Sequence, residues 1–322
     1  MILVTGGAGY IGSHFVREAL KSKRELVVFD NLSRGNKESI SKNVPFENVD
    51  IQDFTLLKSA VAKYDIKSVV HFAAFAYVGE SVQKPDLYYR NNVAGSLNLI
   101  RAAVEMKIEN FVFSSTCSLY GNPEKIPIDE NTQPDLINPY AKSKFMVENI
   151  LKDMSKAYGI KYASLRYFNA AGDDSEGEIG ESHDPETHLI PIVVETALGK
   201  REKVLVFGDD YNTHDGTCIR DYIHVNDLAD AHIKALDYIA DNDSIIVNLG
   251  TGNGNSILEV IKKAEEVSGC KVNYEISKRR EGDPAILVAD NKKAFETLGW
   301  QPKYSLDKII ESAYKWHKNP KY

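Results

Sequence analysis

The chain has 322 residues, 43% hydrophobic and 26% charged, and its 39 basic and 46 acidic residues leave a formal charge of −7. This is the composition of a globular protein long enough for one large α/β domain and a smaller one, and an acidic balance without a basic stripe disfavours nucleic acid as a partner. No run reaches the roughly 18 apolar residues of a membrane span, and a strand-like start leaves no room for a signal peptide. The three cysteines are far apart in the chain. They predict a reducing cytoplasm, no disulfide framework and no metal site.

The first two-thirds of the chain alternates short apolar runs with helical stretches. The runs predict buried strands at 2–5, 26–30, 67–72, 111–114 and 161–166. Helices are expected between them, near 11–22, 53–64, 85–107 and 138–158. Strands that are apolar on both faces and alternate with helices predict an α/β fold, built on a doubly wound, Rossmann-like parallel sheet.

The pattern loosens after about residue 170, where an acidic, glycine-bearing segment at 172–178 predicts a loop. Later elements are expected as helices at 188–199, after Asn226, at 256–267 and at 305–317, and as strands at 204–207 and 245–249. We therefore expect a Rossmann-like domain over 1–170 and a smaller mixed α/β substrate domain over 171–322. The chain should return in part to the first domain at about 221–250.

A glycine-rich turn joins the first expected strand to the first expected helix. Gly6, Gly9 and Gly12 stand in this turn, and the strand–turn–helix context makes the pattern a credible dinucleotide site. The first glycine permits the tight turn, the middle one lets a pyrophosphate approach the backbone, and the last lets the helix pack closely. Free amides at the helix start, near Tyr10 and Ile11, can meet the phosphates. The alternative is a glycine turn without a ligand.

The second expected strand ends in an acid. Asp30 lies 18 residues past Gly12, where a carboxylate can accept both hydroxyls of the adenosine ribose and repels a 2′-phosphate. NAD is therefore predicted over NADP, although Arg34 could accommodate that phosphate. Asp50 and Ile51, just past the expected third strand of the fold, could hold the adenine. Asp50 could equally cap the helix that follows.

Two polar motifs come later. Ser114, Ser115 and Thr116 follow a strand at its carboxyl end, the edge of an open α/β sheet at which ligands bind. Tyr140 and Lys144 lie four residues apart on an expected helix and so share a face. A nearby cation lowers a tyrosine pKa from its usual value of about 10, which would let Tyr140 exchange a proton with a sugar hydroxyl. Taken alone, the motifs could be a polar turn and two solvated helix positions.

These motifs resemble the extended short-chain dehydrogenase/reductases, and further segments resemble the UDP-glucose (UDP-galactose) 4-epimerase family within them. The segments are His71-Phe72-Ala73-Ala74, Val78-Gly79-Glu80-Ser81, Tyr88-Tyr89-Arg90-Asn91-Asn92-Val93, Leu165-Arg166-Tyr167-Phe168-Asn169, His188-Leu189-Ile190-Pro191, the run from Asp215 to Val225, and Arg279-Arg280-Glu281-Gly282-Asp283. The resemblance spans nearly the whole chain and is most specific after Asn169. It implies an isomerase that inverts C4 of a UDP-hexose through a transient 4-keto sugar with bound NAD, and a homodimer.

The resemblance also implies roles for matched residues. Tyr140 would be the acid/base on the sugar 4-hydroxyl, Lys144 would bind the nicotinamide ribose and tune Tyr140, and Thr116 would orient the same hydroxyl. The implied cofactor-binding residues are Gly6, Gly9, Tyr10, Ile11, Gly12, Asp30, Asn31, Asp50, Ile51, Phe72, Ala73, Ala74, Asn91, Ser114, Tyr140, Lys144 and Phe168. The implied substrate-binding residues are Thr116, Tyr140, Asn169, Leu189, Phe207, Arg220, Tyr222, Arg280, Asp283 and Leu287. Arginines suit a diphosphate, and aromatic rings suit a uracil.

Three positions depart from the family pattern. Many members carry serine where this chain has Thr116, and many have asparagine at His188, which leaves a contact between that side chain and uridine open. Leu287 falls at the position that gates sugar size, so activity on N-acetylated UDP-hexosamines is an open alternative.

Other functions would require different residues in this chain. The uronate enzymes would need a cation for the C6 carboxylate of a UDP-uronate. Dehydratases of this superfamily place an Asp-Glu pair where this chain has Cys117 and Ser118, which cannot do that acid/base work. A non-catalytic dinucleotide-binding regulator would commonly lack the tyrosine or the lysine, and fold alone would permit it.

Overall fold

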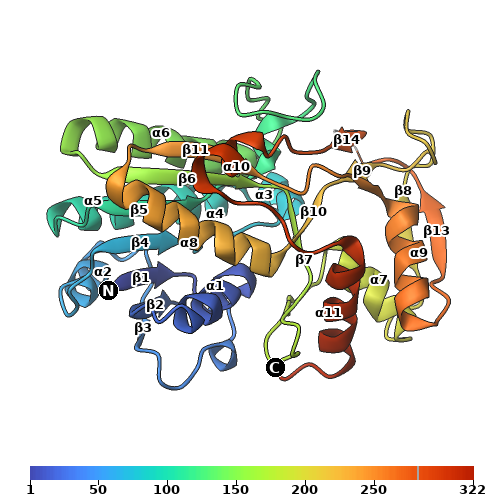
Figure 1. Ribbon diagram of the computed structural model, residues 1–322, viewed down its shortest axis with the longest axis horizontal. Helices are drawn as coiled ribbons and strands as arrows, with labels where there is room; N and C mark the ends of the chain where they lie inside the picture. The colour runs from blue at the N-terminus through green and yellow to red at the C-terminus, as the bar shows by residue number, and fades with distance from the viewer. Residues whose placement is uncertain (281–282) are drawn as a thin grey trace.

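A seven-stranded parallel sheet forms the centre of the protein, seen in a computed structural model that describes residues 1–280 and 283–322 (Figure 1). Its strand order is β11-β6-β5-β4-β1-β2-β3. The strands are β1 (Ile2–Thr5), β2 (Leu26–Asp30), β3 (Phe46–Asn48), β4 (Ser68–His71), β5 (Asn110–Ser114), β6 (Lys161–Tyr167) and β11 (Ile245–Leu249). The predicted doubly wound α/β fold is confirmed.

Helices cover both faces of this sheet because successive strand side chains point to opposite sides. Val4 and Val28 lie in one core, against α1 (Tyr10–Lys21) and α8 (Val225–Asp241). Leu3 and Val27 lie in the other. That second layer consists of α2 (Phe54–Val61), α5 (Ser96–Glu105) and α6 (Pro139–Tyr158). Burial on both faces explains why the strands are continuously apolar.

The helix expected at 85–107 is a joined set of pieces. It begins as α4 (Pro85–Tyr88), continues as a π-helical turn over Tyr89–Gly95, and ends as α5. A short helix, α3 (Val78–Gln83), precedes it and was not predicted. Single π-helical turns are rare in proteins overall, but those that occur often lie at functional sites. This one carries Asn91, one of the predicted cofactor residues.

The smaller domain packs three helices around its own core (Figure 1). These are α7 (Leu189–Ala197), α9 (Ile257–Ser268) and α11 (Leu306–Lys318), close to their predicted ranges. Short strands complete it: β8 (Val204–Phe207) pairs with β13 (Tyr274–Ser277), β7 (Asn169–Ala171) with β10 (Tyr222–His224), and β9 (Ile219–Arg220) with β12 (Asn255–Ser256) and β14 (Ile286–Leu287). Two short 3₁₀ turns lie elsewhere, at Lys37–Ser39 and Cys117–Tyr120.

The chain re-enters the first core more than once. Besides α8 and β11, a late helix, α10 (Lys292–Leu298), packs there together with Trp300, whose indole donates to the carbonyl of Asp227 at 2.9 Å. This late return was not predicted. No helix in the described ranges is long and apolar enough to cross a membrane. The three cysteines are free thiols, and a cytoplasmic location stays a prediction.

Candidate active site

The glycine turn at the end of β1 leaves no space for side chains. Gly6 has φ +71°, and a Cβ added there would lie 2.4 Å from the backbone nitrogen of Ala73. A Cβ on Gly12 would lie 2.2 Å from the carbonyl oxygen of Gly6. The start of α1 and the segment after β4 are thus held tightly against the turn, at the carboxyl edge where α/β sheets bind ligands.

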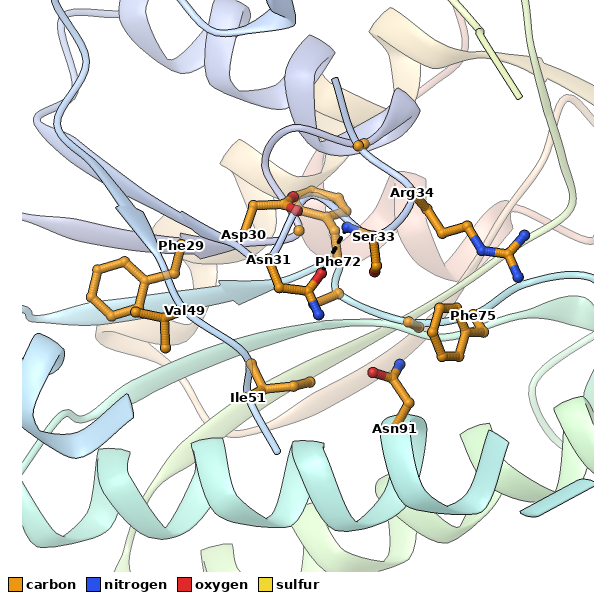
Figure 2. Close-up of a pocket in the computed structure, with 15 residues that line it drawn as sticks. Phe29, Asp30, Asn31, Ser33, Arg34, Val49, Ile51, Phe72, Phe75 and Asn91 are labelled. Carbon is orange, nitrogen blue, oxygen red and sulfur yellow. Dashed lines mark hydrogen bonds between the residues drawn. The ribbon is translucent and has the colours of Figure 1, made fainter. Parts of the chain in front are cut away.

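A pocket lies beside this turn (Figure 2). It is lined by the predicted residues Gly6, Gly9, Asp30, Asn31, Ile51, Phe72, Ala73, Ala74 and Asn91. Its other lining residues are Phe29, Ser33, Arg34, Gly35, Val49 and Phe75, of which the sequence had singled out only Arg34. The missed residues directly flank predicted ones in the chain, which was the available signal. In Figure 2, Asn91 rises from the π-helical turn toward Phe75 on the opposite wall.

Asp30 anchors the turn that it was predicted to accompany. Its carboxylate accepts the backbone N–H groups of Ala8 at 3.0 Å and Leu32 at 2.8 Å. Burial raises the pKa of this carboxyl, and the two N–H groups oppose the rise. Each oxygen keeps accepting capacity for a hydroxyl. Arg34 is paired with Glu80 at 2.8 Å, so its charge is compensated and is not free for a 2′-phosphate.

Asp50 fixes Asn31 and does not cap the next helix. Its carboxylate accepts from the Asn31 amide at 3.0 Å and from the backbone N–H of Gln52 at 2.8 Å. The cap of α2 is Asp53, which accepts from Leu56 N at 3.0 Å. The alternative that Asp50 is the helix cap is therefore wrong, because the helix begins one turn later than that alternative needs.

The side chains of Tyr10 and Ile11 point away from the pocket. The Tyr10 phenol donates to the carbonyl of Gly172, and its ring packs edge-on against His183. Ile11 packs against the core beneath α1. If either residue binds a cofactor, it does so through its backbone at the start of the helix.

Tyr140 stands in the first turn of α6. Asn138 caps that helix by accepting from Ala141 N at 2.8 Å, which fixes the position of the tyrosine. The Thr116 hydroxyl accepts from Ser118 N at 3.1 Å, and Thr116 opposes the rise that burial causes in the pKa of the Tyr140 phenol. The structure therefore places these two predicted catalytic residues close to each other.

Lys144 lies one turn further along α6 and is also buried. Its ammonium donates to the carbonyl of Ser114 at 2.8 Å and lies 4.9 Å from the centre of the Phe113 ring. Burial lowers the pKa of Lys144 to about 7, and the negative charge of Glu148 opposes that shift. The lysine is thus held at the end of β5 and can carry or release its proton near neutral pH.

The prediction that Lys144 lowers the pKa of Tyr140 is wrong for the polypeptide by itself. Burial raises the pKa of Tyr140 above its ordinary value, and Thr116 only partly opposes the rise. The lysine ammonium is occupied by the Ser114 carbonyl. The sequence identified the shared helix face correctly, but burial is a property of the tertiary structure and it dominates here.

A buried polar network supports this helix from behind. Glu148 accepts from Ser115 at 2.6 Å and makes a two-pronged pair with Arg166, at 3.0 and 2.6 Å. Arg166 donates to the phenol of Tyr120 at 3.0 Å, and that phenol donates to the Asn248 side chain at 2.6 Å. The network therefore joins α6, the turn after β5, β6 and β11 at the edge that carries the predicted catalytic residues.

The predicted diphosphate and uridine residues form a second group in the smaller domain. Arg220 pairs with Asp283 at 2.5 Å, and Tyr222 is buried beside them. Arg280 stacks on Phe207, with the guanidinium carbon 3.9 Å from the ring centre. Two guanidinium groups and two aromatic rings therefore gather where the resemblance places a UDP. Glu281 and Gly282 of the same motif lie outside the described residues.

Strand pairing and a small apolar cluster link the predicted substrate residues to the turn that carries Thr116. Asn169 on β7 is the register partner of Tyr222 on β10. Phe168, Cys117 and Leu287 share one small apolar cluster, which places the predicted gate next to the turn that carries Thr116. Burial raises the pKa of Cys117 to about 12, so this thiol is neutral and cannot serve as the acid or base of a dehydratase.

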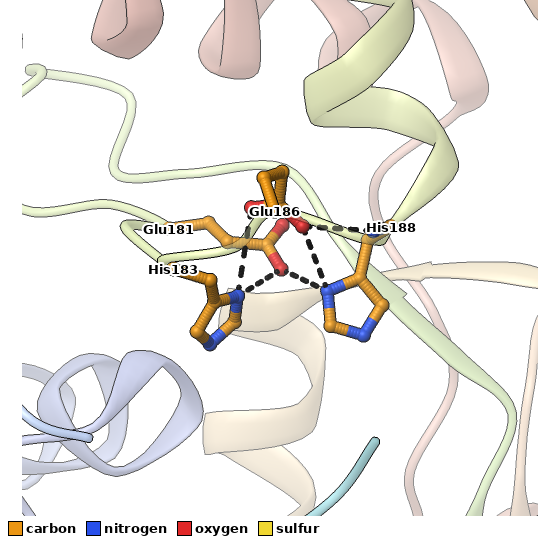
Figure 3. A group of neighbouring side chains, drawn as sticks. All are labelled: Glu181, His183, Glu186 and His188. Carbon is orange, nitrogen blue, oxygen red and sulfur yellow. Dashed lines mark hydrogen bonds and ion pairs between the residues drawn. The ribbon is translucent and has the colours of Figure 1, made fainter. Parts of the chain in front are cut away.

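Leu189 opens α7 directly after His188, which belongs to a cluster with Glu181, His183 and Glu186 (Figure 3). The sequence reasoning did not see this cluster. The available signal was the spacing Glu-x-His-x-x-Glu-x-His in one short segment.

The chain belongs to the NAD dependent epimerase/dehydratase family, whose model matches residues 2–250. It is 49% identical over 317 residues to the UDP-glucose 4-epimerase of Rhizobium meliloti (strain 1021). The aligned region covers 98% of this chain and 96% of that protein. Its structure resembles that of the UDP-glucose 4-epimerase from Brucella ovis in complex with NAD, with a TM-score of 0.95, 46% identity and 97% of each chain covered. The Bifidobacterium longum UDP-glucose 4-epimerase in complex with NAD⁺ and UDP gives a TM-score of 0.94 and 39% identity, over 99% of this chain and 98% of that one. The resemblance inferred from the motifs is confirmed.

Proposed function

We propose that this protein is an NAD-dependent epimerase that inverts C4 of a UDP-hexose, interconverting UDP-glucose and UDP-galactose. The observation that carries the proposal is the burial of Thr116, Tyr140 and Lys144 together, at the sheet edge that also holds the dinucleotide pocket. The identity of its relatives supports the same reaction.

The residues of the pocket fit NAD. Asp30 offers acceptors for the adenosine ribose, and the turn at Gly6 and Gly12 keeps the helix amides clear of side chains. The apolar walls formed by Ile51 and Phe72 suit flat rings. When bound, NAD supplies the hydride acceptor and donor that inversion at a carbon without net oxidation requires.

Tyr140 removes the proton from the sugar 4-hydroxyl as the carbon is oxidised, and it returns that proton after the 4-keto sugar has turned over. Thr116 holds the same hydroxyl, and its side-chain oxygen is itself fixed by accepting from Ser118 N. Lys144 binds the nicotinamide ribose from its buried position one turn further along α6. The fixed positions of these side chains supply the orientation that lowers the barrier.

The UDP remains anchored while the sugar turns. Arg220 and Arg280 hold the diphosphate through guanidinium forks, and Phe207 and Tyr222 wall the uridine. Asn169, Leu189 and Asp283 complete this part of the site, and Leu287 limits the space for the hexose. Anchoring at the nucleotide lets the 4-keto sugar present either face of C4 to the cofactor pocket, and the face that receives the hydride sets the configuration.

The test uses untagged protein, UDP-galactose and no added cofactor, with UDP-glucose measured as the product. We expect conversion by the wild type and a loss of about 10² to 10⁴ in turnover for Tyr140→Phe. UDP binding by Tyr140→Phe, measured by calorimetry, should be unchanged. The matched control is Tyr158→Phe, which alters an exposed tyrosine at the far end of the same helix. Equal turnover in Tyr140→Phe and the wild type would remove the phenol from the mechanism.

The proposal includes a homodimer formed through α5 and α6. Leu97 on α5 and Met146 on α6 are exposed, and Val78 and Val82 on the neighbouring α3 are exposed too. Exposed apolar side chains on adjacent helices are typical of an interface. Sedimentation should give twice the chain mass, and a paired Leu97→Asp, Met146→Asp variant should sediment as a monomer.

A further inference from the structure

Four side chains converge in the loop between β7 and α7 (Figure 3). They are Glu181, His183, Glu186 and His188, and their ligand-type atoms all lie within 4.8 Å of one another. Both imidazoles turn Nδ1 toward the carboxylates. The proposed epimerisation uses none of these four side chains.

The nitrogen–oxygen distances within the cluster are short. From Nδ1 of His183 they are 3.1 Å to Glu181 Oε1 and 3.5 Å to Glu186 Oε2. From Nδ1 of His188 they are 2.7 Å to Glu181 Oε1 and 3.3 Å to Glu186 Oε1. A tetrahedral zinc ion with bonds of about 2.05 Å separates its ligands by about 3.3 Å, so these distances lie near the spacing that one ion requires.

Hydrogen bonds satisfy only part of the cluster: Glu186 Oε1 accepts from the backbone N–H groups of Thr187 and His188, each at 2.7 Å. Glu181 Oε1 and the Nδ1 atoms of both histidines are buried and have no partner of hydrogen-bond geometry, in spite of their closeness. The Glu181 side chain is 3% exposed and Glu186 is 5% exposed. Unpaired buried polar atoms are uncommon, and an ion is one of the explanations for them.

A third carboxyl group lies against the cluster. Asp173 is buried, and its side chain accepts from the backbone N–H of Glu181. Three carboxyl groups thus share a buried site, and the negative charge of the two glutamates is what a divalent cation would neutralise.

We propose that Glu181, His183, Glu186 and His188 bind one divalent transition metal ion, with zinc as the best fit. Two imidazole nitrogens with two carboxylate oxygens suit Zn²⁺, whereas Mg²⁺ and Ca²⁺ prefer all-oxygen sites with more ligands. Four protein ligands leave no open position, so the ion is structural and takes no part in the epimerisation chemistry.

The ion would stabilise the junction between the loop before α7 and the first domain. His188 caps the start of α7, and the next residue is Leu189, assigned to the nucleotide-sugar pocket. The ring of His183 packs against Tyr10 of the glycine turn and against Tyr77 after β4. A metal would therefore fix the loop of the smaller domain against the first domain, between the two halves of the active site.

The competing explanation is a pair of histidine–glutamate ion pairs. The carboxylates raise the pKa of His183 to about 9, so protonated imidazoles could neutralise them without a metal. Binding of Zn²⁺ needs neutral imidazoles and would release these protons. Metal content distinguishes the two explanations directly.

The experiment measures metal in untagged protein by mass spectrometry after purification without chelators, and again after chelation and addition of Zn²⁺. The variants are His188→Ala, at a partly exposed ligand, and Glu186→Gln, which keeps the side-chain size. The matched control is His214→Ala, because exposed His214 also sits beside two carboxylates, Asp215 and Glu259, but outside this cluster. Co²⁺ replaces Zn²⁺ as a visible probe of tetrahedral geometry.

We expect one metal ion per wild-type chain and per His214→Ala chain, and at least a tenfold weaker Zn²⁺ affinity in both ligand variants. Chelation should lower the Tm of the wild type, and Zn²⁺ but not Mg²⁺ should restore it. A wild type that holds no metal, and whose Tm is unaffected by Zn²⁺ or Co²⁺, overturns the proposal in favour of the ion pairs. These readouts do not depend on epimerase activity, so failure of the proposed function would leave them interpretable.

Discussion

Removing the charge of Glu148 should destabilise the protein strongly. The carboxylate and the Arg166 guanidinium are 3% and 6% exposed and share two hydrogen bonds, so neither can turn to water. Glu148→Gln keeps the shape but leaves a buried guanidinium without its counter-charge. Breaking one side of a buried pair costs about 3–5 kcal/mol, and the Tyr120 phenol cannot replace the charge because it only accepts from Arg166.

The assay is urea unfolding followed by far-UV circular dichroism, with wild type and variants at the same protein concentration. Glu148→Met with Arg166→Met should recover most of the loss, because it removes both buried charges. The control is Asp237→Asn, which breaks the exposed pair between Arg24 and Asp237 and should change the stability by less than about 1 kcal/mol. If Glu148→Gln were no worse than Asp237→Asn, the reasoning about buried charge would be refuted.

The same substitution should act on the active site. The Glu148 carboxylate raises the pKa of Lys144 against burial, so its removal lowers that pKa below about 7. In Glu148→Gln, the ammonium form is then lost at a lower pH than in the wild type. Activity relative to wild type should fall more at pH 8 than at pH 6, a pattern that a general loss of folded protein would not produce.

Three further predictions concern separate parts of the chain. Burial raises the pKa of Asp227 to about 6, so the protonated carboxyl stabilises the fold fully below about pH 4, and this contribution is lost as the pH rises through 6. Between pH 5 and pH 7.5, the unfolding free energy of Asp227→Asn should therefore rise by about 1.4 kcal/mol relative to that of the wild type. The same pH dependence of unfolding free energy in both proteins, measured by urea titration, would contradict this. Gly12→Ala places a Cβ 2.2 Å from the Gly6 carbonyl oxygen, so the start of α1 must shift; the dissociation constant for NAD should rise about a hundredfold, and full occupancy at wild-type levels would count against the role of the turn. Leu287→Ala should raise turnover of UDP-N-acetylglucosamine relative to UDP-glucose, and an unchanged ratio in a substrate panel would show that this residue is not the gate.

The large elements could be predicted because each carries its own signal. β1 and β2 follow continuous apolar runs that close with Thr5 and Asp30, and Pro139 and Gly159 mark the two ends of α6. The short strands β9, β12 and β14 could not be seen in this way. Two residues form a strand only because distant backbone supplies the partner, as Ser256 does for Ile219, and a period of two cannot show in so short a run.

The same difference between local signals and long-range contacts applies to the candidate site. The glycine turn and Asp30 were found because their spacing reflects local geometry. Tyr10 was assigned to the cofactor from its place in the motif. Its phenol instead donates a hydrogen bond to the carbonyl of Gly172, which lies 162 residues away in the chain. The pKa of Tyr140 was misjudged for a related reason, since helix spacing gives the neighbour at Lys144 but not the extent of burial.

The backbone ladder between β9 and β14 puts Leu287 opposite Arg220, in adjacent strands at the same register. The residue proposed to limit the hexose and the residue proposed to hold the phosphates are thereby spaced by main-chain hydrogen bonds, whatever side chains they carry. On these proposed roles, exchanging the side chain at position 287 would change which sugar fits and would leave the nucleotide contact of Arg220 in place.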